Sequence, residues 1–447
     1  MRAYLLIAFH NLLQARRRTL LLGLSLALVT MLLIVLGAVS QGFSTTLRDN
    51  ATSLASGHVN VAGWYKSKQT DAWPLIAKPA EIEALVRAKV PGLAAVVRRE
   101  RAWAKAIARN HSFYVSPSGI DITNETRLAD VLRLARENEY MDGGRDAVVG
   151  SLDRLKEPNS ALIFAAQARR LEVGVGDYLT LTAPTGSGRT NTIDVTVVAV
   201  AKDLGFMSNW ALFVPNRTVH ELYETSPEAT SVLMLYLEDP SRAEQVMGDL
   251  RTALVAGGHD VMEHDPQAFF MKFEAVAGED WTGQKLDLTA WTDEVSYISW
   301  VSTVLDTVTA ILVGILMSII AIGIMNAMWM SVGRRTAEIG TARAIGMTRS
   351  GVLAMFMSEA LMLGLVGSSF GALSGVLLAS GLDAMALAVP SQALEALLMS
   401  DTLHFDVSAG QVVNAIVLFT LITGLAAISP AITASRLQPV TAIHHAT

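Results

Sequence analysis

Four long segments of this 447-residue chain contain no Asp, Glu, Lys or Arg, and they constrain the fold more than any other feature. They cover residues 19–47, 307–333, 360–382 and 407–435. A helix needs about 20 apolar residues to cross roughly 30 Å of hydrocarbon, so each segment is long enough to span a membrane. The sequence therefore predicts four transmembrane helices. Their expected bounds are residues 19–43, 301–333, 351–382 and 407–435.

Basic residues flank these segments unevenly, which predicts the orientation of the chain. The flanking arginines are Arg2, Arg16, Arg17 and Arg18 before the first segment, Arg334, Arg335, Arg343 and Arg349 between the second and third, and Arg436 after the fourth. The short loop over residues 383–406 has no Lys or Arg. By the positive-inside rule, both termini and residues 334–350 face the cytoplasm. Residues 44–300 and the short loop are then outside, in a protein of the inner (plasma) membrane.

The two ends of the chain are expected to lie on the cytoplasmic side. Residues 1–18 place apolar side chains at helical spacing, which predicts an amphipathic helix on the inner membrane surface. The alternative, a cleaved signal peptide, is disfavoured because the first apolar run exceeds the usual 7–15 residues of such a segment. Residues 436–447 form the expected cytoplasmic tail.

Composition limits the function classes. The chain is 51% hydrophobic and only 17% charged, as a membrane protein with a large soluble domain would be. Its net charge of −6 disfavours a nucleic-acid partner. It contains no cysteine, so it forms neither a disulfide framework nor a thiolate metal site.

The outside segment alternates between strand and helix patterns and predicts an α+β domain. Strands are expected over 58–62, 94–109, 113–122, 231–237 and 259–264, and helices over 79–90 and 240–256. We expect one split α+β part, made of residues 44–122 and 230–300. A mostly β subdomain over 123–229 interrupts it, with two strands around the Gly-Ser turn at residues 186–190.

No motif supports catalysis or metal binding. The turn at 186–190 lacks the spacing and the lysine of a phosphate-binding loop. His259 and His264 are five residues apart on an expected strand, so they point to opposite faces. The G-x-S-x-G letters at 367–371 lie inside a membrane helix, where no nucleophile elbow forms. Instead, Gly364, Gly367, Gly371 and Gly375 share one helical face, which predicts close packing within the bundle or at a dimer seam.

The segment between the second and third membrane helices has the composition of a docking element. Its basic residues could serve topology alone. Apolar residues and glycines lie between them, however, and these favour contact with a cytoplasmic protein. The expected docking residues are Arg334, Arg335, Glu338, Ile339, Gly340, Arg343, Ile345 and Gly346.

Three stretches carry a family resemblance. They are SVGRRTAEIGTARAIGMTRSGVLAMFMSEALMLGLVG, the N-terminal AFHNLLQARRRTLLLGLSLAL and the C-terminal ISPAITASRLQPVTAIHHA. Together they resemble the ABC permeases that include the lipoprotein-releasing LolC and LolE subunits, the macrolide exporter MacB and the division protein FtsX. The stretch SGHVNVAGWY resembles the LolC and LolE branch most.

The resemblance implies a permease that works with other subunits. Residues 334–350 correspond to the family's coupling helix, which docks into an ATPase. No Walker A sequence occurs in the chain, so ATP and Mg²⁺ are expected on a separate ATPase, with no cofactor in this chain. The family also implies two ATPase copies, a second permease in a homodimer or heterodimer, and a possible periplasmic carrier or adaptor. ATP-driven motion would then reach the outside domain by mechanotransmission.

Three functions stay open at this stage. The first is extraction or expulsion of a lipoprotein or other amphiphile, including MacB-like efflux of small hydrophobic compounds. The second is FtsX-like regulation of an outside hydrolase, and the third is a membrane-anchored enzyme, for which no catalytic constellation exists. For the first, we expect a lateral cleft between the outer ends of two membrane helices. Its expected residues are Leu36, Val39, Phe43, Val301, Val304, Val308 and Leu312.

Overall fold

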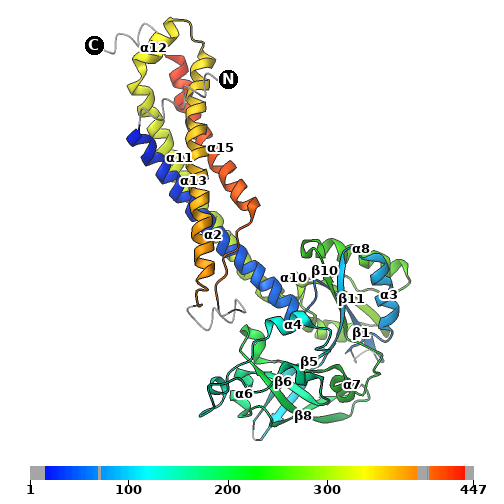
Figure 1. The fold of residues 1–447 in the computed structure, drawn as a ribbon. Coiled ribbons are helices and arrows are strands. Elements are labelled where there is room, and N and C mark those ends of the chain that lie inside the picture. The colour runs from blue at the N-terminus through cyan, green and yellow to red at the C-terminus, as the bar shows by residue number, and fades with distance from the viewer. Residues whose placement is uncertain (1–15, 69–71, 110, 390–399, 401, 438–447) are drawn as a thin grey trace. The chain divides into compact units, whose positions relative to one another are not determined.

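The computed structural model describes residues 16–68, 72–109, 111–389, 400 and 402–437 (Figure 1). The chain divides into two compact units. A helical bundle comprises Met1–Thr45, Val301–Ala388 and Thr402–Thr447, and an α/β domain comprises Thr46–Trp300 and Val389–Asp401. Residues 1–15 of the expected amphipathic helix, residues 390–399 and 401 of the short loop and nearly all of the C-terminal tail lie outside the described residues, and residues 16–18 begin α2.

The bundle contains the four expected membrane-length helices, and each is apolar enough to cross a membrane. They are α2 (Arg16–Leu54), α11 (Ser296–Arg334), α13 (Arg349–Ala384) and α15 (Ala409–Arg436). A short helix, α12 (Thr336–Ala344), joins α11 to α13. The fold class predicted from the charge-free segments is thus confirmed. Helix α2 continues past residue 43, the expected end of the first span.

A mixed apolar core joins the helices of the bundle. Its buried side chains include Leu26, Ile324, Phe356 and Phe419, one from each long helix. The glycine face of α13 allows the backbones of α2 and α15 to approach closely. A Cβ at Gly364 would lie 3.0 Å from Thr420 Cα on α15. Cβ atoms built at Gly367, Gly371 and Gly375 would lie 2.9 Å or less from α2 atoms. The four glycines therefore face helices of the same chain.

The first part of the α/β domain is an antiparallel sheet in the order β11-β1-β10-β3, with β2 paired to β1. Its strands are β1 (Val59–Lys66), β2 (Trp73–Pro74), β3 (Leu93–Arg101), β10 (Val232–Leu237) and β11 (Gly283–Ala290). Helices α3 (Pro79–Lys89) and α8 (Ala243–Ala256) cover one face. The other face packs against η4 (Phe269–Lys272) and α9 (Phe273–Gly278). Because both faces are covered, all six residues of β10 are buried.

The second part is a sheet that closes on itself, in the order β5-β4-β7-β8-β6-β9 with β9 paired back to β5. Its strands are β4 (Ala104–Ala108), β5 (His111–Ile120), β6 (Ser160–Phe164), β7 (Tyr178–Pro184), β8 (Thr190–Ala201) and β9 (Ala211–Pro215). Short helices surround it: α4 (Thr126–Val131), α5 (Glu137–Tyr140), η1 (Leu152–Lys156), α6 (Ala165–Leu171), η2 (Gly205–Asn209) and α7 (Asn216–Tyr223). The Gly-Ser turn expected at 186–190 links β7 to β8, as predicted.

Two expectations for this domain are wrong. The boundary between its parts lies near residue 102 rather than at 122, because β4 and β5 belong to the second sheet. The alanines at 102, 104, 106 and 108 all point into its core. In addition, residues 259–264 form only a single bridge at Val261, and β11 takes the place of the expected strand. Sequence alternation cannot show which of two cores receives an apolar face.

Candidate functional site

The turn between α11 and α13 is the best-formed candidate site in the bundle. Helix α12 ends at Ala344, and Gly346 two residues later has a φ of +115°, a conformation that favours glycine. Helix α13 then begins after Thr348, whose side chain accepts a hydrogen bond from Gly351 N at 3.1 Å. Both ends of the turn are therefore set by local chemistry, and α12 has a defined position on the bundle.

Three contacts hold the inner face of α12 against the bundle. Ile339 is 3% exposed and belongs to the apolar core. The guanidinium of Arg335, just before α12, lies 3.1 Å from the Glu359 carboxylate on α13, and the side chain of Glu359 is 2% exposed. Arg343 donates to the carbonyl oxygens of Ser435 and Leu437 at the end of α15. These contacts fasten α12 to α13 and α15.

The outer face of the turn carries the residues that remain open to a partner. The side chain of Glu338 is 77% exposed, and Ile345 is 83% exposed. Arg334 and Gly346 are also exposed. The eight expected docking residues therefore divide into two groups. Arg335, Ile339, Gly340 and Arg343 face the bundle, whereas Arg334, Glu338, Ile345 and Gly346 face outward.

The seven residues expected to line a lateral cleft do not share one environment. Phe43 is buried at 6% exposure, and Leu36 and Val39 are half-buried. Val304, Val308 and Leu312 are exposed, and the side chain of Val301 is not among those described. Between them, Ser40 Oγ donates to Asp306 Oδ1 at 2.5 Å, joining α2 to α11. The helices are thus bridged at this level.

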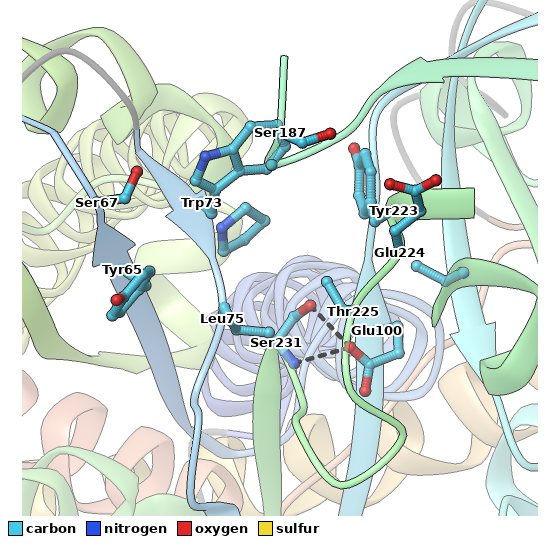
Figure 2. A pocket seen from close by; sticks show the side chains of 13 residues that line it. Tyr65, Ser67, Trp73, Leu75, Glu100, Ser187, Tyr223, Glu224, Thr225 and Ser231 are labelled. Carbon is cyan, nitrogen blue, oxygen red and sulfur yellow. Dashed lines mark hydrogen bonds between the residues drawn. The ribbon is translucent and has the colours of Figure 1, made fainter. Parts of the chain in front are cut away.

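A small pocket in the α/β domain surrounds Glu100, at the junction of the two sheets (Figure 2). Its volume is about 240 Å³. Both the backbone N and the Oγ of Ser231 donate to Glu100 Oε2 at 3.0 Å. His220 Nε2 lies 3.8 Å from Glu100 Oε1. Burial raises the pKa of the Glu100 carboxyl to about 7 and lowers the pKa of His220.

The raised pKa of Glu100 predicts a specific pH dependence of stability. Below about pH 4.5, folded and unfolded chains both carry this proton. Between there and about pH 7 only the folded chain holds it, so the free energy of unfolding falls as pH rises through this window. The E100Q variant keeps an acceptor for Ser231 and should melt at a higher temperature than the wild type above pH 7. Thermal unfolding of the full chain in detergent across pH measures this.

The control is E224Q, because Glu224 lines the same pocket with an exposed carboxylate. We expect its melting profile to follow that of the wild type. His220 acts in the opposite direction, since a lowered pKa adds stability as pH rises. Because both E100Q and the wild type contain His220, its contribution to the pH dependence cancels in the difference between their melting profiles. Parallel profiles for E100Q and the wild type would contradict the assignment to Glu100.

Two family models match this chain in the order that the structure shows. Residues 19–253, more than half of the chain, match the MacB-like periplasmic core domain. Residues 310–439 match the FtsX-like permease C-terminal domain. The chain belongs to the MacB/FtsX superfamily of ABC transporter permeases. The MacB/FtsX architecture accounts for one membrane helix before the α/β domain and three after it.

Individual relatives of this MacB/FtsX permease match over part of their length. The macrolide export ATP-binding/permease protein MacB of Hahella chejuensis is 38% identical over 123 residues, which are 27% of this chain and 16% of that protein. The uncharacterized ABC transporter permease YvrN of Bacillus subtilis is 33% identical over 123 residues, 28% of this chain and 26% of that protein. The matched region thus spans about a sixth to a quarter of these relatives.

Two solved structures match part of this chain at low identity. The periplasmic region of MacB from Actinobacillus actinomycetemcomitans is 12% identical, covering 55% of this chain and 94% of that chain with a TM-score of 0.30. The extracellular domain of the transporter YknZ from Gram-positive bacteria is 15% identical, covering 44% of this chain and 95% of that chain with a TM-score of 0.28.

Some site residues of this MacB/FtsX permease carry no motif in sequence. Glu100 lies in the polar run Arg98–Arg101, and nothing there reveals that this residue is only 3% exposed. A second cavity is lined by Phe269, Phe270 and Phe273. Here the sequence carries a signal, because the stretch QAFFMKF is unusually rich in aromatic residues for a soluble domain.

Proposed function

We propose that this chain is the permease subunit of an ABC transporter that moves an amphiphile from the outer side of the inner membrane. A separate ATPase subunit binds ATP and Mg²⁺, and two copies of it serve a dimer of permeases. Closure of the ATPases moves α12, and the membrane helices pass this motion to the α/β domain. The amphiphile never crosses the bilayer through a pore.

The proposed orientation places α12 in the cytoplasm and the α/β domain outside. The arginines around α12 and at the start of α2 support it, because basic residues are retained on the cytoplasmic side. Next to the ends of α11 and α13 away from α12, residues 286–300 and the loop 383–406 contain no Lys or Arg, as the positive-inside rule expects on the outer side. Both termini are then cytoplasmic.

The attachment of α12 to the bundle carries the proposal. A docking element transmits force only if it is fixed to what it must move. Arg335, Ile339 and Arg343 fix α12 to α13 and α15, while Glu338 and Ile345 remain open to solvent. An exposed isoleucine and an exposed carboxylate within one short segment are the kind of apolar anchor and polar rim that protein interfaces use.

Copurification of ATPase activity tests this docking. The tagged full chain, purified from its native membrane, should retain ATP hydrolysis and a Walker A protein identified by mass spectrometry. I345D places a charge in the expected apolar contact, and E338K reverses the exposed charge in the first turn of α12. Each should reduce the retained activity at least tenfold, since interface anchors contribute about 2 kcal/mol or more.

The matched control for docking is M385D. Met385 is also a large exposed apolar residue, 68% exposed, but it lies at the other end of α13. The M385D chain should retain the ATPase as the wild type does. Equal retention by I345D, E338K and M385D would reject α12 as the docking element.

The substrate class within the amphiphiles has two candidates, lipoproteins and small hydrophobic compounds. The stretch that resembles the lipoprotein-releasing branch does not choose between them. Its residues Ser56, His58, Asn60 and Trp64 are all 3% exposed or less, so they stabilise β1 rather than contact a substrate. Lateral entry between α2 and α11 would require the hydrogen bond between Ser40 and Asp306 to break.

A further inference from the structure

A second, larger cavity lies in the α/β domain, between its two sheets, and has a volume of about 500 Å³. That volume falls within the range of pockets that bind small organic molecules. The walls are mainly aromatic and apolar. The principal side chains are Trp103, Met207, Trp210, Phe269, Phe270 and Phe273.

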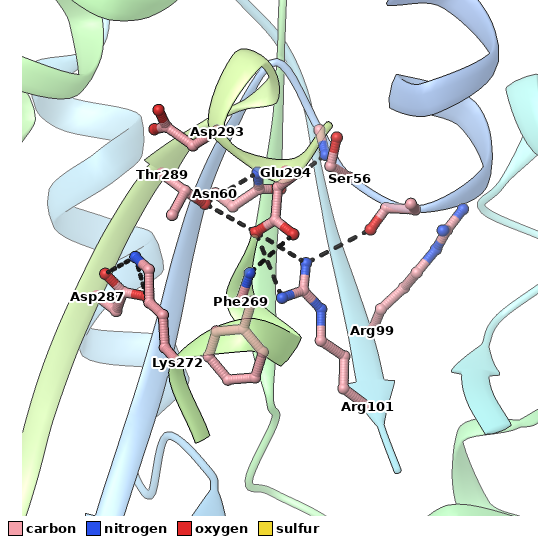
Figure 3. A network of polar contacts seen from close by, with 12 residues as sticks. Ser56, Asn60, Arg99, Arg101, Phe269, Lys272, Asp287, Thr289, Asp293 and Glu294 are labelled. Atoms are coloured by element: carbon pink, nitrogen blue, oxygen red, sulfur yellow. Dashed lines mark hydrogen bonds and ion pairs between the residues drawn. The ribbon is translucent and has the colours of Figure 1, made fainter. Parts of the chain in front are cut away.

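The aromatic wall is held in place before any ligand arrives. Trp64, which is fully buried, stacks on Phe269 with ring centroids 4.3 Å apart and meets the edge of Phe273 at 4.7 Å. Lys272, in the same segment, forms a buried ion pair with Asp287 at 3.0 Å (Figure 3). The opposite wall is joined to this segment by Trp210, whose ring lies 5.8 Å from that of Phe270.

Large apolar side chains nevertheless remain open inside the cavity. Trp103 is 49% exposed, Phe270 is 46% exposed and Phe273 is 38% exposed. Three aromatic rings exposed around one hollow offer flat faces to a ligand with a flat apolar body. The cavity is therefore both shaped in advance and only partly filled by the protein.

One charged pair lines the cavity, Arg101 and Glu294, and its bonding is unequal (Figure 3). Glu294 has one short hydrogen bond, because its carboxylate accepts from Thr289 Oγ1 at 2.9 Å, and a longer one from Phe269 N at 3.4 Å. The guanidinium of Arg101 reaches Glu294 only at 3.4 and 3.5 Å and Ala55 O at 3.4 Å. Charge-assisted hydrogen bonds are usually about 2.7–2.9 Å.

Arg101 is thus the charged residue of this cavity whose hydrogen-bond donors are least engaged. Its side chain is 16% exposed, against 6% for Glu294, and it lies over the Phe269 ring at 4.7 Å. A guanidinium held against an aromatic ring, with its donors weakly engaged, is suited to an anionic group with two or more oxygens, such as a carboxylate, sulfonate or phosphate. A cationic ligand would instead compete with Arg101 for Glu294.

We propose that this cavity binds an amphiphile with a flat apolar body and an anionic group, and that Arg101 recognises the anion. This proposal rests on the proposed function, because it names the chemistry of the transported molecule. The cavity also contains Leu54, the last residue of α2, and Glu294, which precedes α11 in the chain. A bound ligand would thus contact the segments that continue into both membrane helices.

Two matched fluorescent probes test the proposal on the full chain in nanodiscs, without ATPase or nucleotide. Anilinonaphthalene sulfonate has a flat apolar body and an anion, and phenylnaphthylamine has the same body without the anion. After subtraction of protein-free nanodiscs, the sulfonate should bind saturably and about tenfold or more tightly than the neutral probe. In R101Q, the two probes should bind with equal affinity.

Two further variants separate the cavity from the rest of the surface. Ser118 lines the cavity and lies on β5, paired with Arg101 on the neighbouring strand β3. The S118W variant should therefore fill the cavity and abolish saturable binding of both probes. Tyr178 is an aromatic residue with 70% exposure outside the cavity, so Y178A should bind as the wild type does. Equal affinity for the two probes in the wild type, or unchanged selectivity in R101Q, would overturn the proposal.

Displacement experiments distinguish a membrane lipid from a water-soluble amphiphile as the natural ligand. Displacement of the sulfonate probe by short-chain phosphatidylglycerol supports the site as one for a lipid. Resistance to this lipid, with displacement by naphthalene sulfonate, supports it as a site for a water-borne amphiphile. Because no ATPase is present, failure of probe binding leaves docking at α12 standing. A failed copurification likewise leaves the binding result intact.

Discussion

The R335M variant should lose most of its folded population in detergent, because it removes the guanidinium that is paired with Glu359. The Glu359 side chain is 2% exposed among the helices of the bundle. Removing one partner of a buried ion pair typically costs about 3–5 kcal/mol, a large part of the stability of a small domain. Size-exclusion chromatography and thermal unfolding of the full chain measure the loss.

A double variant and a surface control show whether the buried charge causes that loss. R335M combined with E359L replaces the pair with apolar side chains of similar volume, an exchange that is often neutral or stabilising. Folding should therefore recover. Arg217 and Glu221 form an exposed pair, so R217M should cost less than about 1 kcal/mol. If R335M unfolds no more than R217M, the ion pair contributes little to the position of α12.

G371A should also destabilise the bundle strongly. A Cβ at Gly371 would lie 2.3 Å from the carbonyl oxygen of Ala27 and 2.7 Å from its Cα, both of them backbone atoms. Backbone cannot rotate away as a side chain can, so α2 and α13 must move apart. Overpacking of this kind costs about 1–3 kcal/mol or more. The melting temperature of the full chain in detergent should fall accordingly.

Gly381 gives the matched control on the same helix. Nothing lies within 4 Å of a Cβ built there, so G381A adds no contact. Alanine favours a helix over glycine by about 1 kcal/mol, so this variant should be unchanged or slightly stabilised. Equal melting of G371A and G381A would show that α2 and α13 do not approach as closely as the structure indicates.

The helical half of the fold could be predicted from sequence because the membrane imposes one simple rule. Spans must be apolar and about 20 residues long, and the absence of charge marked all four of them. The glycine spacing at 364–375 also predicted a close-packed face. The helices that this face contacts could not be predicted, because the spacing of glycines does not identify the partner helix.

The α/β domain was harder to predict because its core contains charge. Strand β11 was missed since its sequence, GQKLDLTA, reads as polar. Asp287 in this strand is 1% exposed, and its partner Lys272 lies elsewhere in the sequence. A buried ion pair of this kind is invisible in a hydrophobicity pattern. The same holds for Arg101 and Glu294, which the fold brings together from strands and helices far apart in the chain.

The sequence identifies the docking segment, but it does not show which of its residues are exposed. Composition identified residues 334–346, yet Ile339 and Ile345 look equivalent in sequence. The structure buries the first at 3% exposure and leaves the second at 83%. Helical spacing from Ile339 to the end of α12 could have indicated different faces. The deciding feature, the left-handed Gly346 that turns the chain, required the backbone itself.

Photo-crosslinking from residue 345 in living cells tests the central claim most directly. A benzophenone amino acid at Ile345 should form an adduct with the ATPase subunit, which exists only in the cytoplasm. The same amino acid at Tyr178, exposed on the α/β domain, should form none with that subunit. Adding E338K to the Ile345 variant should weaken the adduct. An ATPase adduct from Tyr178 and none from Ile345 would contradict both the docking surface and the orientation of the chain.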